Sequence, residues 1–263
     1  MAEISPLMEQ YGIIKRQHLK EVLFFRVGDF YEMFNDDAIE VSRLLNLTLT
    51  HRGDDPMCGV PYHAAKVYIA RLLRLGKRIA ICEQVTPPSK GKGLTERKVV
   101  EIISPGNTLE QEYLDQGANN FLGSLCYVKD YVAYSYIDIS TGEFYSVKWK
   151  KNQTTQEMAK EIGRSTPKEL ILSMSMQKDE DILFVLNQFP NISVDYEQDW
   201  YFSKENSYKI LLKQFGTTSL HSFSLTDDSP EIVPAGFLLE YLAKTTATQN
   251  QDRTFPQVTT LKT

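Results

Sequence analysis

The sequence has few cysteines and no long apolar run, and both absences narrow the classes of protein it can encode. Its three cysteines, Cys58, Cys82 and Cys126, are odd in number and widely spaced, which argues against a disulfide framework and suits a reducing compartment. No stretch reaches the roughly 18 consecutive apolar residues that a membrane-spanning helix needs. The N-terminus, MAEISPLMEQ, lacks the basic segment and apolar core of a secretory signal. We therefore expect a cytoplasmic protein with no membrane partner.

Phosphate-binding loops are absent as well. Neither G-x-x-x-x-G-K-[ST] nor G-x-G-x-x-G occurs, and the Gly-Lys pairs at 76–77 and 91–92 are followed by Arg78 and Gly93. Nucleotide hydrolysis by a phosphate-cradling loop is therefore not encoded in these residues.

The chain is also short of positive charge, because its formal net charge is −5. That balance argues against a strongly basic nucleic-acid binder, but the charges are unevenly distributed. Residues 66–98 hold nine basic and two acidic residues, whereas residues 27–42 hold five acidic residues and no basic one. We expect a bound partner to meet the basic block, with the acidic residues set aside or used against a specific group. Lys66, Arg71 and Arg74 on a predicted helix are interpreted as a solvated face.

Length and composition predict two modest globular domains or one large one. The chain has 263 residues, of which 42% are hydrophobic and 24% charged, close to globular averages. Strands alternating with helices predict α/β architecture, and residues 104–120, which lack periodicity, are expected to form a linker. In the first half we expect helices at 5–14, 36–45 and 64–75, strands at 22–26, 47–50, 78–85 and 98–104, and a loop at 51–61. In the second half we expect strands at 122–128, 131–139, 142–149, 169–173 and 192–196, and helices at 154–163, 179–189, 203–214 and 231–246.

His51, Cys58 and His63 are the nearest approach to a metal site or a cysteine–histidine pair. Their spacing, H-x6-C-x4-H, matches no usual zinc pattern, and no fourth ligand is evident. A nucleophilic Cys58 would also need an orienting carboxylate. We interpret the three residues as a thiol and two imidazoles that pack or meet solvent.

Asp138, in the segment YIDISTGEF, supports an alternative function. Ribonuclease-H-like nucleases place a metal-binding aspartate on such a strand, and two-metal phosphoryl transfer needs several converging carboxylates. Glu143 and Asp195 are the next candidates, although no pattern supports them. The competing interpretation is an aspartate that bonds its own hairpin turn. A metal-dependent, ribonuclease-H-like nuclease is therefore the alternative hypothesis.

The segment Gly28-Asp29-Phe30-Tyr31-Glu32 carries the sharpest signal. If 30–32 is extended, Phe30 and Glu32 point to one side and Tyr31 to the other. A buried Glu32 would need a partner. On a face that meets a nucleic acid, a phenylalanine can wedge between stacked bases and a carboxylate can share a hydrogen bond with a base edge. Pattern alone also allows a plain core strand.

The segment FFRVGDFYEMF resembles the mismatch-reading strand of the MutS family of bacterial DNA mismatch-recognition proteins. The motifs THRG, PMCGVPYHA, YIARLL, IAICEQV, YIDISTGEF and QFGT fall in the family's order, so the resemblance covers nearly the whole chain. It implies that the function is recognition of mispaired or unpaired bases in DNA mismatch repair. It also implies that a phenylalanine wedge and a glutamate contact act from the minor groove.

The resemblance implies two α/β domains. A mixed sheet flanked by helices forms a mismatch-binding domain over 1–110, a linker covers 111–120, and a ribonuclease-H-like connector domain without catalysis covers 121–250. Residues 251–263 are then the start of a lever and core region. The family continues into a DNA clamp and an ATPase that uses ATP and Mg²⁺. The resemblance implies that neither the clamp nor the ATPase is in this chain, which agrees with the missing phosphate-binding loop.

The same resemblance implies partners and site residues. It implies a homodimer of the full-length protein, a MutL-type partner on the connector domain, and no catalysis or cofactor in this part of the chain. Phe30 corresponds to the family's stacking phenylalanine and Glu32 to its base-contacting glutamate. Arg52 and Met57 match positions along the DNA near the mismatch. The alternative for Arg52 is a solvated loop arginine, and Met57 is equally consistent with core packing. The short acidic segment 53–56 departs from familiar relatives.

Overall fold

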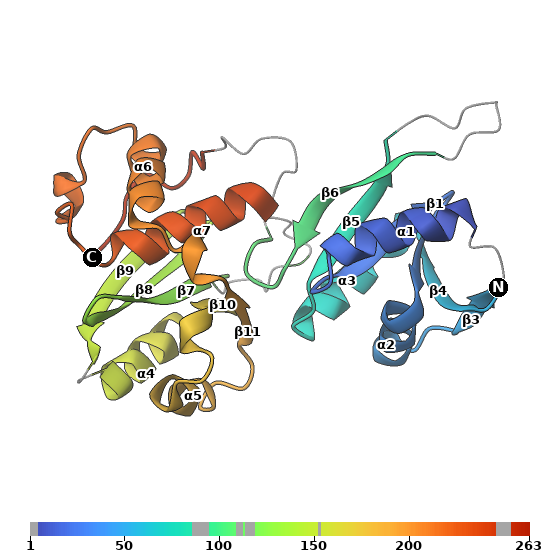
Figure 1. Cartoon of the computed structure of the whole chain (residues 1–263), viewed down its shortest axis with the longest axis horizontal. Coiled ribbons are helices and arrows are strands. Elements are labelled where there is room, and N and C mark those ends of the chain that lie inside the picture. Colours follow the sequence, from blue (N-terminus) through green and yellow to red (C-terminus); the bar gives the residue numbers. More distant parts are fainter. Residues whose placement is uncertain (1–4, 86–94, 109–112, 114–118, 152–153, 246–253) are drawn as a thin grey trace. The chain divides into compact units, whose positions relative to one another are not determined.

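A computed structural model describes residues 5–85, 95–108, 113, 119–151, 154–245 and 254–263 (Figure 1). The chain divides into two compact units, and the division falls between Ser104 and Pro105. We call them the first unit and the second unit and describe each by itself. Both are mixed α/β structures, as the sequence predicted. Within the described ranges, no helix has the length and apolar character needed to cross a bilayer.

The first unit is built on a six-stranded mixed sheet. Its spatial order is β3-β4-β2-β1-β5-β6, in which β1 and β5 are parallel and the other neighbours are antiparallel. The strands are β1 (Val22–Val27), β2 (Phe30–Phe34), β3 (Thr50–Arg52), β4 (Asp55–Pro61), β5 (Ile79–Gln84) and β6 (Arg97–Ile103).

Helices cover both faces of this sheet (Figure 1). The helix α1 (Pro6–Gln17) begins at Ser5, whose side chain accepts a hydrogen bond from the Met8 amide, and Pro6 occupies the first turn. Tyr11 of α1 packs with Phe25 and Phe34 of the sheet. We call the sheet face that carries these residues the α1 face. The helices α2 (Asn35–Leu45) and α3 (Ala65–Arg74) lie on the other face, where α2 packs against β4.

The region between α2 and α3 differs from the sequence-based prediction. The strand predicted at 47–50 is wrong, because the structure begins strand β3 only at Thr50. The loop predicted at 51–61 is also wrong: β3 and β4 form a hairpin in which Arg52 lies opposite Asp55. Gly53, at φ +62°, permits the turn. The two prolines and three charged residues of this segment hide the strand signal, and pairing of β4 with β2 supplies the order that local sequence does not.

The second unit is built on a five-stranded sheet. Its spatial order is β11-β10-β7-β8-β9, with β7, β8 and β9 antiparallel and with β10 parallel to both β7 and β11. Counted within the unit, this is the order 5-4-1-2-3, a mixed sheet. The strands are β7 (Leu122–Val128), β8 (Tyr131–Asp138), β9 (Glu143–Lys150), β10 (Glu169–Ser173) and β11 (Ser193–Glu197).

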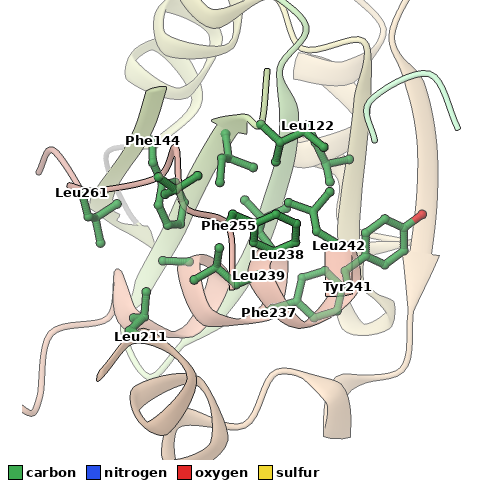
Figure 2. Packing of buried hydrophobic residues seen from close by; sticks show 14 of the residues in the cluster. Leu122, Phe144, Leu211, Phe237, Leu238, Leu239, Tyr241, Leu242, Phe255 and Leu261 are labelled. Carbon is green, nitrogen blue, oxygen red and sulfur yellow. The ribbon is translucent and has the colours of Figure 1, made fainter. Parts of the chain in front are cut away.

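Two helix pairs enclose the second sheet (Figure 1). The helices α4 (Thr154–Ser165) and α5 (Glu180–Leu186) pack on the face that carries Tyr134 and Leu172. The helices α6 (Lys204–Phe215) and α7 (Ile232–Thr245) pack on the opposite face. Figure 2 shows Leu238 and Leu242 of α7 between that helix and the sheet, close to Leu122.

The expected linker and tail segments both touch the second unit. At the start of the linker, the Gly106 amide donates to Glu169 Oε2 at 3.2 Å, and Asn107 is buried. Most of 109–118 lies outside the described residues. In the tail, Phe255 and Leu261 are buried in the α7 core (Figure 2). The backbone of Lys262 forms hydrogen bonds with Phe144 and Ser146, on either side of Tyr145, and so pairs with the edge of β9.

Candidate nucleic-acid interface

Phe30 stands at the tip of the hairpin that joins β1 and β2. Val27 lies opposite Phe30, so the connection is the two-residue turn Gly28-Asp29, with Gly28 at φ +58°. Phe30 is 47% exposed, whereas the remaining β2 residues, Tyr31 to Phe34, are all buried. A large apolar side chain is therefore presented to solvent by a rigid strand rather than by a loop.

Contacts from aromatic and charged side chains hold this turn in place. The Arg26 guanidinium lies 3.5 Å from the centre of the Tyr62 ring, and its Nε donates to the Gly28 carbonyl at 2.5 Å. The Tyr62 amide donates to the Asp29 carbonyl at 2.8 Å. Tyr31, on the opposite face from Phe30, donates its hydroxyl to Glu83. Burial and the Glu83 hydrogen bond both raise the pKa of Tyr31, so the phenol stays protonated. Sequence analysis did not single out Arg26 or Tyr62.

Glu32 lies on the same sheet face as Phe30, as strand alternation predicted. It is 8% exposed and sits between Phe25 of β1 and Gly59 of β4. Its Oε1 accepts a hydrogen bond from Arg52 Nη2 at 2.9 Å. Its Oε2 is buried and has no hydrogen-bond partner among the described residues. Burial raises the pKa of Glu32 and outweighs the opposing effect of the Arg52 charge.

Gly59 keeps the surface between Phe30 and Glu32 open. A Cβ built there would lie 3.3 Å from the Tyr31 carbonyl oxygen, 3.7 Å from Glu32 Cγ and 3.9 Å from Phe30 Cδ1. Any side chain at this position would therefore cover the strip that joins the aromatic ring to the carboxylate. Nothing in the local sequence singles out this glycine, because its role depends on the β2–β4 register.

Arg52 and Met57 lie on the same face but differ in surroundings. The Arg52 side chain is 42% exposed and reaches Glu32 from the neighbouring hairpin. Met57 is half-buried opposite Phe34 and packs against the core beneath α1. The structure thus brings Phe30, Glu32 and Arg52 together at the open part of the α1 face, with Met57 at the rim of the core.

Arg97 is a further charged residue of this face that sequence analysis did not identify. It is buried, and its Nε donates to the Arg26 carbonyl at 2.6 Å while Nη1 donates to Gln10 Oε1 at 2.9 Å. Its guanidinium lies 4.9 Å from the centre of the Phe25 ring. Its positive charge, like that of Arg52, partly offsets the rise that burial causes in the pKa of Glu32. The available signal was its place in the basic block 66–98, immediately before the strand-like run KVVEII, and nothing there set it apart from the other basic residues.

Of the predicted basic block, Arg97 lies on the α1 face, whereas the basic residues of α3 do not line the site. Lys66, Arg71 and Arg74 are exposed on α3, which packs on the sheet face opposite Phe30 and Glu32. This placement fits a solvated face. Lys90 and Lys92, from the same block, lie outside the described residues.

The cysteine and histidine candidates do not form a metal site. Cys58 is buried, and burial raises the pKa of its thiol to about 11, whereas His51 and His63 are exposed. In the described part of the chain, no cluster of three histidine, cysteine, aspartate or glutamate residues could hold a metal ion.

Asp138 binds its own turn. Its Oδ1 accepts from the Ser140 amide at 2.9 Å and the Ser140 hydroxyl at 2.6 Å, and its Oδ2 accepts from the Asn120 amide at 2.9 Å. Glu143 accepts a hydrogen bond from Asn119, and Asp195 lies on β11, three strands away from Asp138 in the sheet. These three carboxylates do not converge, so the geometry fits the hairpin interpretation rather than a two-metal centre.

Comparison with known proteins identifies the family. The model of MutS domain I matches residues 5–112, and that of MutS domain II matches residues 120–254. The chain belongs to the MutS family. The domain II match corresponds to the second unit and the domain I match to the first, including the α1 face and its exposed phenylalanine.

Curated MutS relatives agree with this assignment. The chain is 51% identical over 249 residues to the DNA mismatch repair protein MutS of Treponema denticola, an alignment that covers 90% of this chain and 28% of that protein. It is 43% identical to the protein of the same name from Treponema pallidum and 40% identical to that of Halothermothrix orenii. These alignments cover 94% and 93% of this chain, and 27% and 28% of the relatives. The chain therefore spans less than a third of the length of these MutS relatives.

Proposed function

We propose that the first unit recognises mispaired or unpaired bases in duplex DNA as part of DNA mismatch repair. The observation that carries the proposal is Phe30, a half-exposed aromatic ring on a rigid strand, beside the buried carboxylate of Glu32. In a plain core strand this ring would be buried, or an exposed position would carry a polar residue instead. The names of the curated relatives support the same function.

The proposed mechanism is a test of DNA deformability. Inserting an aromatic wedge from the minor groove partly unstacks a base step and kinks the duplex, at a cost of a few kcal/mol per step. A mispaired or unpaired step is easier to unstack than a paired one. Phe30 therefore enters defective steps more readily, and its rigid hairpin does not need to be ordered first.

Glu32 adds a penalty against correctly paired DNA. An ionised carboxylate near phosphates and base acceptors is repelled unless a base donor or a shared proton satisfies it. Glu32 already has one buried oxygen without a partner in the described structure. A mismatch that offers a donor to that oxygen removes the penalty, whereas a paired duplex leaves it in place.

Partners of the full-length protein are part of the same proposal. We propose that the second unit docks a MutL-type partner, that the full-length protein is a homodimer, and that ATP and Mg²⁺ act outside these residues. The family resemblance and the lack of a phosphate-binding loop in this chain support these statements. In the QFGT segment, Gln214 donates to the carbonyls of Phe255 and Val258. We therefore place docking on the exposed side of α6 rather than on Gln214.

The test uses a chimera, because one small domain contacts few phosphates and the whole chain is net acidic, so the chain should bind DNA weakly by itself. In the MutS protein of Treponema denticola, the matching region is replaced by this chain. Phe30→Ala should remove about 1–3 kcal/mol of discrimination between mismatched and paired duplexes, the usual worth of base–aromatic stacking. Phe184→Ala is the matched control, because Phe184 is also an exposed phenylalanine and lies in the second unit. Equal discrimination by the Phe30 variant and the control would contradict the proposal.

A further inference from the structure

The two side chains of the Glu32–Arg52 ion pair differ in their exposure to solvent. Glu32 is held inside the sheet, with a side chain that is 11% exposed, whereas the Arg52 side chain is 42% exposed. One carboxylate oxygen has Arg52 Nη2 at 2.9 Å, and the other is buried without a partner in the described structure. Arg52 can therefore leave toward a ligand, while Glu32 cannot follow it.

Few charged groups face Glu32 from the elements around it. The strand β3 contributes Arg52, with Asp55 of β4 opposite it, and β6 contributes Arg97. Gln10 of α1 binds Arg97. The strands β1 and β4 place only Phe25 and Gly59 directly opposite the carboxylate. Of the two arginines, Arg97 is buried and held by three hydrogen bonds, so Arg52 is the cation whose position can change.

We propose that Arg52 is the positioning residue that keeps Glu32 ionised in the free protein and on paired DNA, and that Glu32 takes up a proton when Arg52 leaves it for a phosphate of a duplex that Phe30 has entered. The inference rests on the proposed function, because the phosphate is that of the duplex which Phe30 probes. The proton comes from solvent and adds to a carboxylate oxygen. The product is a neutral carboxylic acid that donates one hydrogen bond and accepts others.

This exchange makes Arg52 a specificity-determining residue. A carboxylate that loses its counter-ion while remaining buried has two choices: it stays charged at a large desolvation cost, or it is protonated. As the pH falls through the pKa of Glu32, the charge that opposes paired DNA is lost and discrimination should fall. Removing Arg52 should move that fall to higher pH, because loss of a nearby positive charge raises the pKa of a carboxyl group.

The first experiment measures Glu32 directly in the free chain. Glutamate side chains are labelled with carbon-13, the carboxyl signals are followed by NMR over a pH titration, and Glu32→Gln identifies the signal. Arg52→Gln should raise the pKa of Glu32 by about 1–3 units, the usual effect of an opposite charge at this distance. Arg52→Lys should restore part of the shift because it keeps the charge. Arg43→Gln, at an exposed arginine of α2, should have no effect.

The second experiment follows discrimination against pH in the chimera. The pH at which discrimination falls should rise in Arg52→Gln and return toward the parent value in Arg52→Lys. A Glu32 titration that is the same in Arg52→Gln and the parent overturns the inference, as does a discrimination profile that does not move with the titration. The titration needs no DNA. A chimera that ignores mismatches would therefore contradict the proposed function, and the titration would still decide whether Arg52 sets the charge of Glu32.

Discussion

Glu32 and Asp138 are both buried carboxylates beside hairpins, yet they are used in opposite ways. Both oxygens of Asp138 accept hydrogen bonds from backbone or hydroxyl groups of its own unit. Glu32 has one oxygen bonded to the partly exposed Arg52 and the other without a partner in the described structure. Two large side chains lie near Asp138, those of Ile139 and Phe144, and both are buried. Phe30, beside Glu32, is exposed.

The comparison shows how to separate a structural acid from a candidate site. A carboxylate whose bonding capacity is filled stabilises its turn and has nothing left for a ligand. A buried carboxylate with an oxygen that accepts no hydrogen bond lowers the stability of the fold. Such a destabilising group is kept where it serves a function. Position in the sequence does not distinguish the two, because each lies in a strand next to a glycine-containing turn.

The largest expected effect is at Asp138. Asp138→Ala should lower the free energy of unfolding by about 2–3 kcal/mol, because it removes the acceptor of the buried Asn120 amide and of the Ser140 amide and hydroxyl at the β8–β9 turn. Urea unfolding of the chain measures this loss. Mismatch discrimination by the chimera should stay unchanged. Metal-dependent cleavage of DNA that Asp138→Asn abolishes would contradict this assignment and favour the nuclease hypothesis.

Much of this contrast could be predicted from sequence, but not all of it. Strand alternation correctly placed Phe30 and Glu32 on one face, and the turn residues after Asp138 correctly suggested an aspartate that bonds its own turn. The Glu32–Arg52 pair could not be predicted. It depends on the β3–β4 hairpin, which the sequence analysis assigned to a loop because its prolines and charges weaken the strand pattern.

Non-local contacts account for the other residues that were missed. Arg97 lies 71 residues from the Arg26 carbonyl that it binds. Gly59 matters only because β4 pairs with β2 in a register that places it opposite Glu32. Local periodicity reports which side of a strand a residue occupies, but it does not report which strand lies beside it.

A smaller effect is expected at Gly59. Gly59→Ala should weaken binding of a mismatched duplex by about 1–2 kcal/mol, because the added methyl group covers the strip between Phe30 and Glu32 and keeps the DNA away. It should also lower stability by about 1 kcal/mol, because the new Cβ would lie a tight 3.3 Å from the Tyr31 carbonyl oxygen, and the backbone there would have to shift slightly. Binding titrations and thermal unfolding check the two values.

Gly163→Ala is the control for that substitution. Gly163 lies in α4 of the second unit, where a Cβ would meet the Phe189 ring at an ordinary 3.5 Å. Alanine favours helix over glycine, so this variant should be as stable as the parent or more stable, with unchanged DNA binding. Equal DNA binding by the Gly59 and Gly163 variants would show that the strip beside Phe30 does not contact the duplex.

The most direct test of the account is the affinity of Glu32→Gln for paired and mismatched duplexes, measured in the chimera at several salt concentrations. Glutamine keeps the shape of the side chain and removes its charge. We predict that the variant binds paired DNA more tightly by about 1 kcal/mol, that binding of the mismatch changes less, and that the difference shrinks as salt screens the phosphates. Discrimination is then lost through stronger binding of the wrong duplex, whereas Phe30→Ala loses it through weaker binding of the right one. Equal weakening of both duplexes by Glu32→Gln would show that the carboxylate is structural, like that of Asp138, and would contradict the account.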